Sequence, residues 1–462
     1  MKIKLIFLLT ICFSHIAANA TNLLTIYHQA LLNDTIYQQA ISQRLSTKEE
    51  VPISLAALLP NLSANTNPTV TRSGFSGTNL NDHFSPRNTT IRSYGLTLTL
   101  TQTVFNAAQF AAVAGSLSVS KGADAIINAA LQNLMVRVAS AYFAILKDED
   151  NLSYNEAAKL AYAGELDQVR QQYQVGLKTI TDVYTAQASY DSAVASYIAA
   201  QTTLSNDKEN LRVITGVYYP QLSSLSEAFP LTTPHPANVE AWVNTAQKQN
   251  WSIKAAQYAV NTSLQNVRQQ FAGHLPTVSL EGTVDRLYSN SINGYNTLED
   301  RHGPATETDK AIAININLPL FSGGSVIAQT QQASYNYQVT QHQLEQIVRN
   351  TINTTRQSYL NVISGVSQIS ADKQAIKSNV SSLRGMEVSY KVGTETLVNV
   401  LDQQQKLFLA QTQYATDRYA FVNNILLLKE AAGTLNFDDL RTLNIWLVDK
   451  KSQNFRRLSR NR

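Results

Sequence analysis

Residues able to do covalent or metal chemistry are scarce in this chain. One cysteine, Cys12, and seven histidines occur among 462 residues, and the histidines do not stand at metal-ligand spacing. The sequence has no G-x-S-x-G nucleophile elbow, no Walker phosphate loop and no paired-carboxylate motif in a plausible cleft. We therefore expect no enzymatic activity, no cofactor and no metal, and a secreted enzyme is the weakest hypothesis.

The N-terminus is typical of an export signal. Two lysines precede the apolar stretch 5–13, and the small-residue pattern Ala18-Asn19-Ala20 follows. This order predicts a signal peptide at 1–20, with a buried N-terminal helix as the alternative. The residues before Cys12 are larger than a lipidated cysteine requires, so Cys12 is interpreted as part of the signal. A mature chain would then contain no cysteine.

The charge balance and the hydropathy restrict which classes of protein remain possible. The formal charge of +4 falls to about +2 without the two signal lysines, so nucleic-acid binding gains no support. No later segment approaches the ~18 consecutive apolar residues of a membrane-spanning helix. A membrane-spanning part would have to be β-structure.

An internal repeat organises the chain. The segment from Tyr173 to Val183 matches the segment from Tyr390 to Val400 at an offset of 217 residues. Upstream, Leu59-Pro60 matches Leu275-Pro276 at an offset of 216 residues. A register this persistent predicts two structural repeats. The predicted parts are repeats at 21–219 and 237–434, a proline-rich linker at 220–236, a C-terminal segment at 435–449 and a basic, disordered tail at 450–462.

Proline placement predicts a pair of long helices in each repeat. Prolines are absent between Pro86 and Pro220 and after Pro319. We expect long helices over 105–173 and 322–390, each about 100 Å long at ~1.5 Å per residue. Gly176 and Gly393 then end them, and a returning helix follows, capped by Thr179 or Thr181 in one repeat and Thr394 or Thr396 in the other.

The returning helices carry heptad seams, which we interpret as packing. The first seam has Asp207 as its polar member, and its apolar members are Val183, Ala186, Tyr190, Ala193, Tyr197, Ala200, Leu204, Leu211 and Ile214. The second is interrupted by three polar residues, and its apolar members are Val400, Leu407, Ala410, Tyr414, Phe421, Leu428 and Ala431.

Before each long helix the hydrophobic period changes to two, which predicts β-hairpins at about 60–104 and 276–320. Polar loops are expected near 72–90 and 288–308. A soluble sheet packed on helices is one explanation, but the strands have about the ~9–11 residues that cross a bilayer. Four strands cannot close a barrel, and open edges in lipid leave backbone groups unpaired. We therefore expect other chains to complete the barrel.

Several motifs resemble the TolC family of outer-membrane channel-tunnels over nearly the whole mature sequence. They include Ala141-Tyr142-Phe143, Gly273-His-Leu-Pro276, Leu318-Pro-Leu-Phe-Ser-Gly-Gly324 and Gly433-Thr-Leu-Asn436. The resemblance implies a mixed α/β membrane protein in the outer membrane of a Gram-negative bacterium. Three chains would each give four antiparallel strands to a twelve-stranded barrel that continues into an α-helical barrel. The proline-rich linker and the C-terminal segment would form a belt around the helices.

The resemblance also implies a drug-efflux or type I secretion duct. The chain would form a homotrimer and would contact outer-membrane lipid. Its other partners would be a periplasmic adaptor and an inner-membrane RND or ABC transporter. Turns at the periplasmic tip would meet the adaptor, and the first matches the family better than the second. Their residues are Val175, Gly176 and Leu177, and Val392, Gly393 and Thr394. A periplasmic coiled-coil scaffold without a pore is the competing hypothesis, and it leaves the hairpins unexplained.

By the same resemblance, two acidic rings should line the closed aperture, at Asn399 and Asp402. Only Asp402 is acidic here, so we expect weaker cation selectivity than two rings would give.

The resemblance further implies links that hold the aperture shut. A tyrosine, matched by Tyr390, should reach Asp182, which follows Thr181. The family's arginine position is Glu395, which would repel Asp182. Lys178 is the repeat mate of Glu395, so we hypothesise a swapped ion pair between them; two solvated turn residues are the alternative.

Overall fold

The computed structural model describes residues 20–74, 88–291 and 304–448. The predicted basic tail and all but the last residue of the predicted signal lie outside these ranges. The chain divides into two compact units. The helical unit contains 20–42, 125–253 and 347–448, and the strand-bearing unit contains 43–124 and 254–346 within the described ranges. Each unit takes segments from both halves of the sequence, so the units do not coincide with the predicted repeats.

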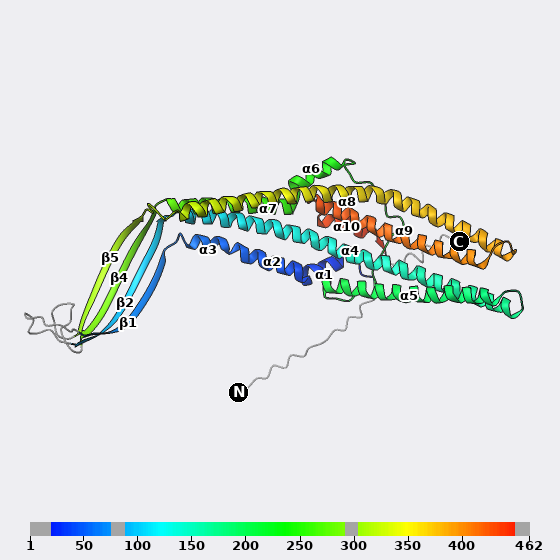
Figure 1. Cartoon of the computed structure of the whole chain (residues 1–462), viewed down its shortest axis with the longest axis horizontal. Coiled ribbons are helices and arrows are strands. Elements are labelled where there is room, and N and C mark those ends of the chain that lie inside the picture. Colours follow the sequence, from blue (N-terminus) through cyan, green and yellow to red (C-terminus); the bar gives the residue numbers. More distant parts are fainter. Residues whose placement is uncertain (1–19, 75–87, 292–303, 449–462) are drawn as a thin grey trace, which may run out of the picture. The chain divides into compact units, whose positions relative to one another are not determined.

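The strand-bearing unit holds a four-stranded antiparallel sheet in the order β1-β2-β4-β5 (Figure 1). Its strands are β1 (Asn61–Gly74), β2 (Asn88–Phe105), β4 (Thr277–Ser291) and β5 (Pro304–Asn317). The strands lie where the alternation of apolar and polar residues predicted them. They have 14 to 18 residues and are longer than predicted. Residues 72–74 and 88–90, assigned to a polar loop, continue the ladder because strand pairing satisfies backbone groups whatever the side-chain polarity.

The two faces of this sheet differ in polarity. Leu98 stands opposite Ala64 on one side and Val284 on the other, so these apolar side chains share a face. On the same face, Ile314 is 68% exposed to solvent. The residues between them are mostly threonine, serine and asparagine, as the alternating pattern predicts. β1 and β5 end the sheet, and neither edge is paired by another described strand.

Short helices precede both hairpins. The first hairpin follows α1 (Leu23–Asn33), α2 (Thr35–Lys48) and α3 (Glu50–Ala56); the second follows α6 (Val239–Gln249), α7 (Trp251–Phe271) and the 3₁₀ turn η1 (Ala272–His274). Long helices come after each hairpin. They are α4 (Ala107–Gln174) with α5 (Ile180–Thr215), and α8 (Ser325–Lys391) with α9 (Leu397–Ala431).

The long helices confirm the proline-based prediction closely. α4 has 68 residues and α8 has 67. α8 begins three residues later than predicted because Gly323 and Gly324 adopt φ angles of 60° and 82° and form a turn immediately before the helix.

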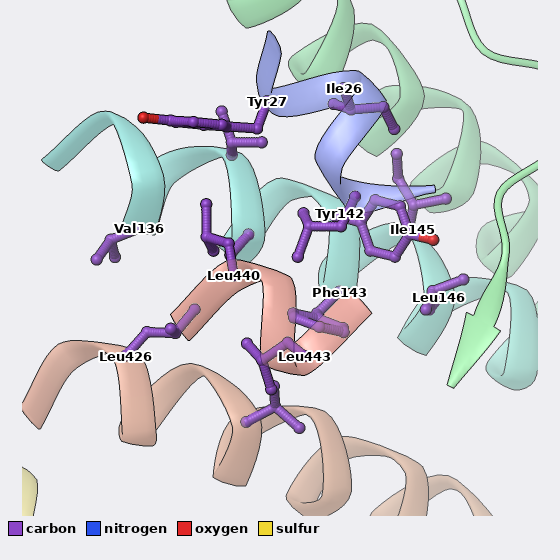
Figure 2. Close-up of a cluster of buried hydrophobic side chains, with 14 of the residues drawn as sticks. Ile26, Tyr27, Val136, Tyr142, Phe143, Ile145, Leu146, Leu426, Leu440 and Leu443 are labelled. Atoms are coloured by element: carbon purple, nitrogen blue, oxygen red, sulfur yellow. The ribbon is translucent and has the colours of Figure 1, made fainter. Parts of the chain in front are cut away.

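A hydrophobic core in the helical unit joins α1, α4, α9 and the C-terminal helix α10 (Phe437–Ile445) (Figure 2). Tyr142 and Phe143 of α4 are fully buried at its centre, and their rings meet edge to face at 5.5 Å. The Tyr142 hydroxyl donates to the carbonyl of Ser223 at 2.5 Å, so this buried polar group has a partner. The core thus fixes the N-terminal helix and the C-terminal helix on the long helices.

The heptad seam of α5 is buried where the pattern predicts it, with Ala186, Ala193, Leu204 and Leu211 inside. α9 differs because it is buried on two sides. Phe421 and Leu428 of the predicted seam belong to one cluster, whereas Tyr419, Val422 and Leu426 belong to another. A single heptad seam describes a helix that packs on one side only, so the predicted seam did not include the second buried side of α9.

The proline-rich linker and the C-terminal segment meet in the helical unit. β3 (Ser224–Leu225) pairs with β6 (Leu447–Val448), and the buried guanidinium of Arg418 donates to the carbonyl of Leu225 at 3.0 Å. Two segments far apart in sequence are thereby tied to α9.

Among the described residues, α4 is the one helix long and apolar enough to cross a membrane, with an 18-residue stretch of mean hydropathy 1.4. The helix contains no run of consecutive apolar residues of this length, and the mean hydropathy of the stretch averages over polar interruptions. Of that stretch, 56% is buried inside the chain, as in a core helix. We therefore assign α4 to packing.

Candidate functional site

The two turns that end the long helices have the same backbone geometry. Gly176 and Gly393 adopt φ angles of 77° and 84°. In the first turn Gly176 donates to the carbonyl of Tyr173 and Leu177 donates to that of Gln172; Gly393 and Thr394 repeat the pattern in the second. These paired bonds satisfy carbonyls that the helix end would leave free. The left-handed conformation favours glycine at both positions, as predicted.

One threonine caps each returning helix. Thr179 and Asp182 form a reciprocal capping box at the start of α5, and the Thr396 hydroxyl accepts from the backbone of Asn399 at the start of α9. The alternative caps are not used. Thr181 lies inside α5, and the hydroxyl of Thr394 donates to the carbonyl of Ser389.

Asp182 makes different contacts from those predicted. Its carboxylate accepts from the backbone nitrogen and the hydroxyl of Thr179, at 3.0 and 2.9 Å. The backbone hydrogen bond from Thr179 holds the pKa of Asp182 below its usual value, and nearby Lys178 adds to the effect. The predicted hydrogen bond with Tyr390 is not formed within the chain, because the Tyr390 hydroxyl is buried without a hydrogen-bond partner among the described residues.

Lys178 and Glu395 also differ from the hypothesis. The ammonium nitrogen of Lys178 lies 4.2 Å from the centre of the Tyr390 ring, and Glu395 accepts a 2.7 Å hydrogen bond from the Asn399 amide. The swapped ion pair is therefore not formed within this chain. Each side chain contacts another partner: Glu395 contacts an amide in the first turn of α9, which follows it, and Lys178 contacts an aromatic face.

An acidic residue near the first turn, Glu165, was not among the predicted site residues. Glu165 of α4 has a buried carboxylate oxygen without a hydrogen-bond partner in the described chain. Burial raises its pKa, and Glu387 of α8 raises it further, while Lys178 and Lys391 oppose the shift. A charged residue on an otherwise apolar helical face was the signal that could have revealed it.

Asp402 and Asn399 lie one turn apart near the start of α9, and they face different surroundings. Asp402 is exposed and lines a cavity of about 650 Å³, open to solvent, between α4, α5 and α9. Thr181 lines the same cavity, whereas Asn399 turns its amide to Glu395. The structure thus brings Asp402 and Thr181 to one cavity and leaves Asn399 outside it.

The turns themselves expose apolar side chains. Val175 and Val392 are each 70% exposed, and Leu177 is 73% exposed. Such residues at a helical tip suit contact with another protein.

The described part of the chain holds no group of three or more histidine, cysteine, aspartate or glutamate side chains that could bind a metal. The candidate site is therefore one of shape, polarity and charge at the ends of four helices.

Comparisons with known proteins cover almost the whole chain. A family model described as outer membrane efflux protein matches residues 26–217 and 242–434. The outer membrane protein TolC of Escherichia coli is 34% identical over 447 residues, covering 95% of this chain and 87% of that protein. The alkaline protease secretion protein AprF of Pseudomonas aeruginosa is 28% identical, covering 92% of this chain and 86% of that protein.

A solved structure shares the fold. The outer membrane protein VceC of Vibrio cholerae superposes with a TM-score of 0.72 at 22% identity, covering 89% of this chain and 96% of that chain.

Proposed function

The chain belongs to the outer membrane efflux protein family, and from this membership we propose that it forms the exit duct of a drug-efflux or type I protein-secretion system. Relatives named for protease secretion and for outer-membrane efflux both match it. The family consists of outer-membrane channels rather than enzymes. The duct would lie in the outer membrane of a Gram-negative bacterium.

The sheet carries this proposal. β1 and β5 leave its two edges unpaired among the described strands, and one face carries apolar residues from each of the four strands. Lipid gives no partner to a free backbone edge, so other copies must complete the wall. Three chains with four strands each would make a twelve-stranded barrel, with apolar residues toward lipid and threonine and asparagine toward a water-filled lumen.

The pore hypothesis is tested with the full chain in outer-membrane fractions. We expect a trimer that resists detergent, changes its gel mobility on heating and conducts ions in planar lipid bilayers. A monomer that dissolves without detergent would contradict the proposal and would favour the coiled-coil scaffold.

The helical tip is proposed as the gate of this duct. Three Asp402 carboxylates at the constriction would repel anions, and the neutral Asn399 would weaken the cation preference. The contact between Lys178 and Tyr390 and the capping box of Asp182 would hold the turns in the closed arrangement.

Exposed apolar residues in both turns support docking of a periplasmic adaptor, which in turn would bind an inner-membrane RND or ABC transporter. Pull-down of the adaptor with wild-type chain and with Leu177→Asp tests this contact. Equal recovery of adaptor by both would contradict it.

A further inference from the structure

Charge is divided between the two faces of the four-stranded sheet. Each strand carries one basic residue, and the register places all of them on the apolar face, which bears Leu98 and Val284. Together they form a basic band: Arg72 of β1, Arg92 of β2, Arg286 of β4 and Lys310 of β5. The acidic residues of the same strands all lie on the opposite, polar face: Glu281, Asp285, Glu307 and Asp309.

The basic band is not neutralised by the part of the chain that the structure describes. Its four side chains are exposed, and none of them forms an ion pair with a described carboxylate. The carboxylates of the sheet point to the other side, where Asp285 stands directly opposite Asp309. Two like charges in that position repel each other, so the polar face suits water, which screens them. The basic band is left to attract an anion outside the protein.

The position of the basic band along the strands indicates the edge of a hydrocarbon layer. On β5, Ile312, Ile314 and Ile316 separate Lys310 from the end of the strand that leads to α8. The other three strands have the same order, with mostly apolar residues on this face between the basic residue and the helices. A charge on the lipid face of a barrel is costly at the middle of a bilayer and costs little at its interface.

Two aromatic rings lie within the basic band. Tyr94 and Tyr288 stand opposite each other, between the rows of Arg286 and Arg92, with ring centres 6.2 Å apart. Aromatic girdles lie at the interfaces of membrane barrels. The basic band runs obliquely, because from β1 to β5 each basic residue lies nearer the helices than the one before it. Strands in closed barrels tilt by about 35–45° from the axis, so an oblique band can follow the plane of a membrane.

We infer that the basic band binds the phosphate groups of phosphorylated glycolipid in the outer leaflet of the outer membrane. This inference rests on the proposed function, in which the long helices extend into the periplasm and the basic band lies at the opposite interface. Arginine suits this ligand because its guanidinium fork matches two oxygens of one phosphate, and three of the four residues are arginine. Three copies would surround the barrel with three such bands.

The test uses the full-length assembly in detergent and native mass spectrometry, which counts bound lipid and gives its Kd. The probe is diphosphoryl lipid A, and digalactosyldiacylglycerol is the uncharged glycolipid for comparison. We expect lipid A to bind at least about tenfold more tightly. Equal binding of the two lipids would overturn the inference. Displacement of lipid A by millimolar inorganic phosphate at constant ionic strength would show a site for free anions and would overturn it as well.

A double variant locates the site. Arg92→Gln with Arg286→Gln removes two charges from the paired strands β2 and β4 and should weaken lipid A binding about tenfold. Arg384→Gln with Arg441→Gln is the matched control, since it removes two exposed arginines of α8 and α10 and should leave the Kd unchanged. Equal loss of binding in the two double variants would contradict the inference.

Conductance in planar bilayers separates this inference from the proposed function. A trimer that conducts ions but binds both lipids alike overturns the lipid site alone, whereas absence of trimers and of conductance removes the proposed duct. The heat-modifiable trimer is checked on gels for each variant. If the variant in the basic band does not assemble, the comparison of the two lipids on the wild-type chain still decides the outcome.

Discussion

The ammonium nitrogen of Lys178 lies 4.2 Å from the centre of the Tyr390 ring, so a cation–π contact joins the first turn to the end of α8. The two residues belong to different helix pairs. The contact therefore links the helix pair α4–α5 directly to the helix pair α8–α9 at the tip. The sequence predicted an ion pair and a hydrogen bond there instead.

Loss of this contact should loosen the gate. Lys178→Met removes an interaction of about 0.5–1 kcal/mol, which corresponds to a two- to fivefold rise in open probability. Single-channel recordings in planar bilayers measure it. Lys377→Met, at an exposed lysine of α8, is the control and should behave as wild type.

The charge exchange Lys178→Glu with Glu395→Lys should not restore the closed state. The two side chains have other partners in the structure, so the double variant should conduct at least as much as Lys178→Met. Recovery of wild-type conductance would show that an ion pair forms in the assembly.

Ion selectivity should follow the charge at the start of α9. Asp402→Ala is expected to shift the reversal potential in a KCl gradient toward zero, because it removes the carboxylate that repels anions. Asn399→Asp should shift it in the opposite direction. Unchanged selectivity in Asp402→Ala would place the constriction elsewhere.

Two pairs of buried carboxyl groups should make stability depend on pH. Asp148 of α4, 3% exposed, faces Asp207 of α5, and Asp372 of α8, 7% exposed, faces Asp417 of α9. In each pair the more buried residue has an oxygen without a hydrogen-bond donor in the described chain. Burial raises the pKa of Asp148 and of Asp372, and the facing aspartate raises it further; Lys147 opposes the shift at Asp148, and Gln368 opposes it at Asp372.

The sign follows from these raised pKa values. A folded-state pKa above the unfolded value of about 3.8 gives stability that is complete at lower pH and is lost as pH rises through the folded-state pKa. The Tm of the wild type should therefore fall through these groups as the pH rises above the unfolded value of about 3.8. Asp207→Asn with Asp417→Asn supplies a permanent amide donor and should flatten that fall. Asp191→Asn, on the exposed side of α5, should keep the wild-type profile.

Two left-handed glycines should respond differently to alanine. Both Gly176 and Gly433 have positive φ, at 77° and 73°, and a side chain there costs about 1–2 kcal/mol. An added Cβ at Gly176 meets nothing within 4 Å, whereas at Gly433 it would stand 2.6 Å from the backbone carbonyl of Gln249. Gly433→Ala should therefore lower the Tm well beyond Gly176→Ala. Equal melting temperatures for the two variants would show that the backbone of Gln249 moves away from the added Cβ without a cost in stability.

Local features of the sequence determined most of the secondary structure. Glycines at 176 and 393 and a change of period before each long helix predicted the turns and strands, and the sequence offered two candidate caps in each repeat, of which the structure uses Thr179 and Thr396. These signals depend on residues a few positions apart, so they persist in any tertiary context. The polarity of the two sheet faces followed from the same alternation.

The tertiary structure alone decided which side chains meet. Glu395 was predicted to pair with Lys178, but its hydrogen-bond partner is Asn399, in the first turn of α9. The second buried side of α9 and the division into units likewise depend on segments more than a hundred residues apart in the sequence. Each carboxyl pair depends on how the two helices of one helix pair lie against each other. Which of these contacts form depends on competition among side chains that are close in space, and a sequence pattern does not specify those distances.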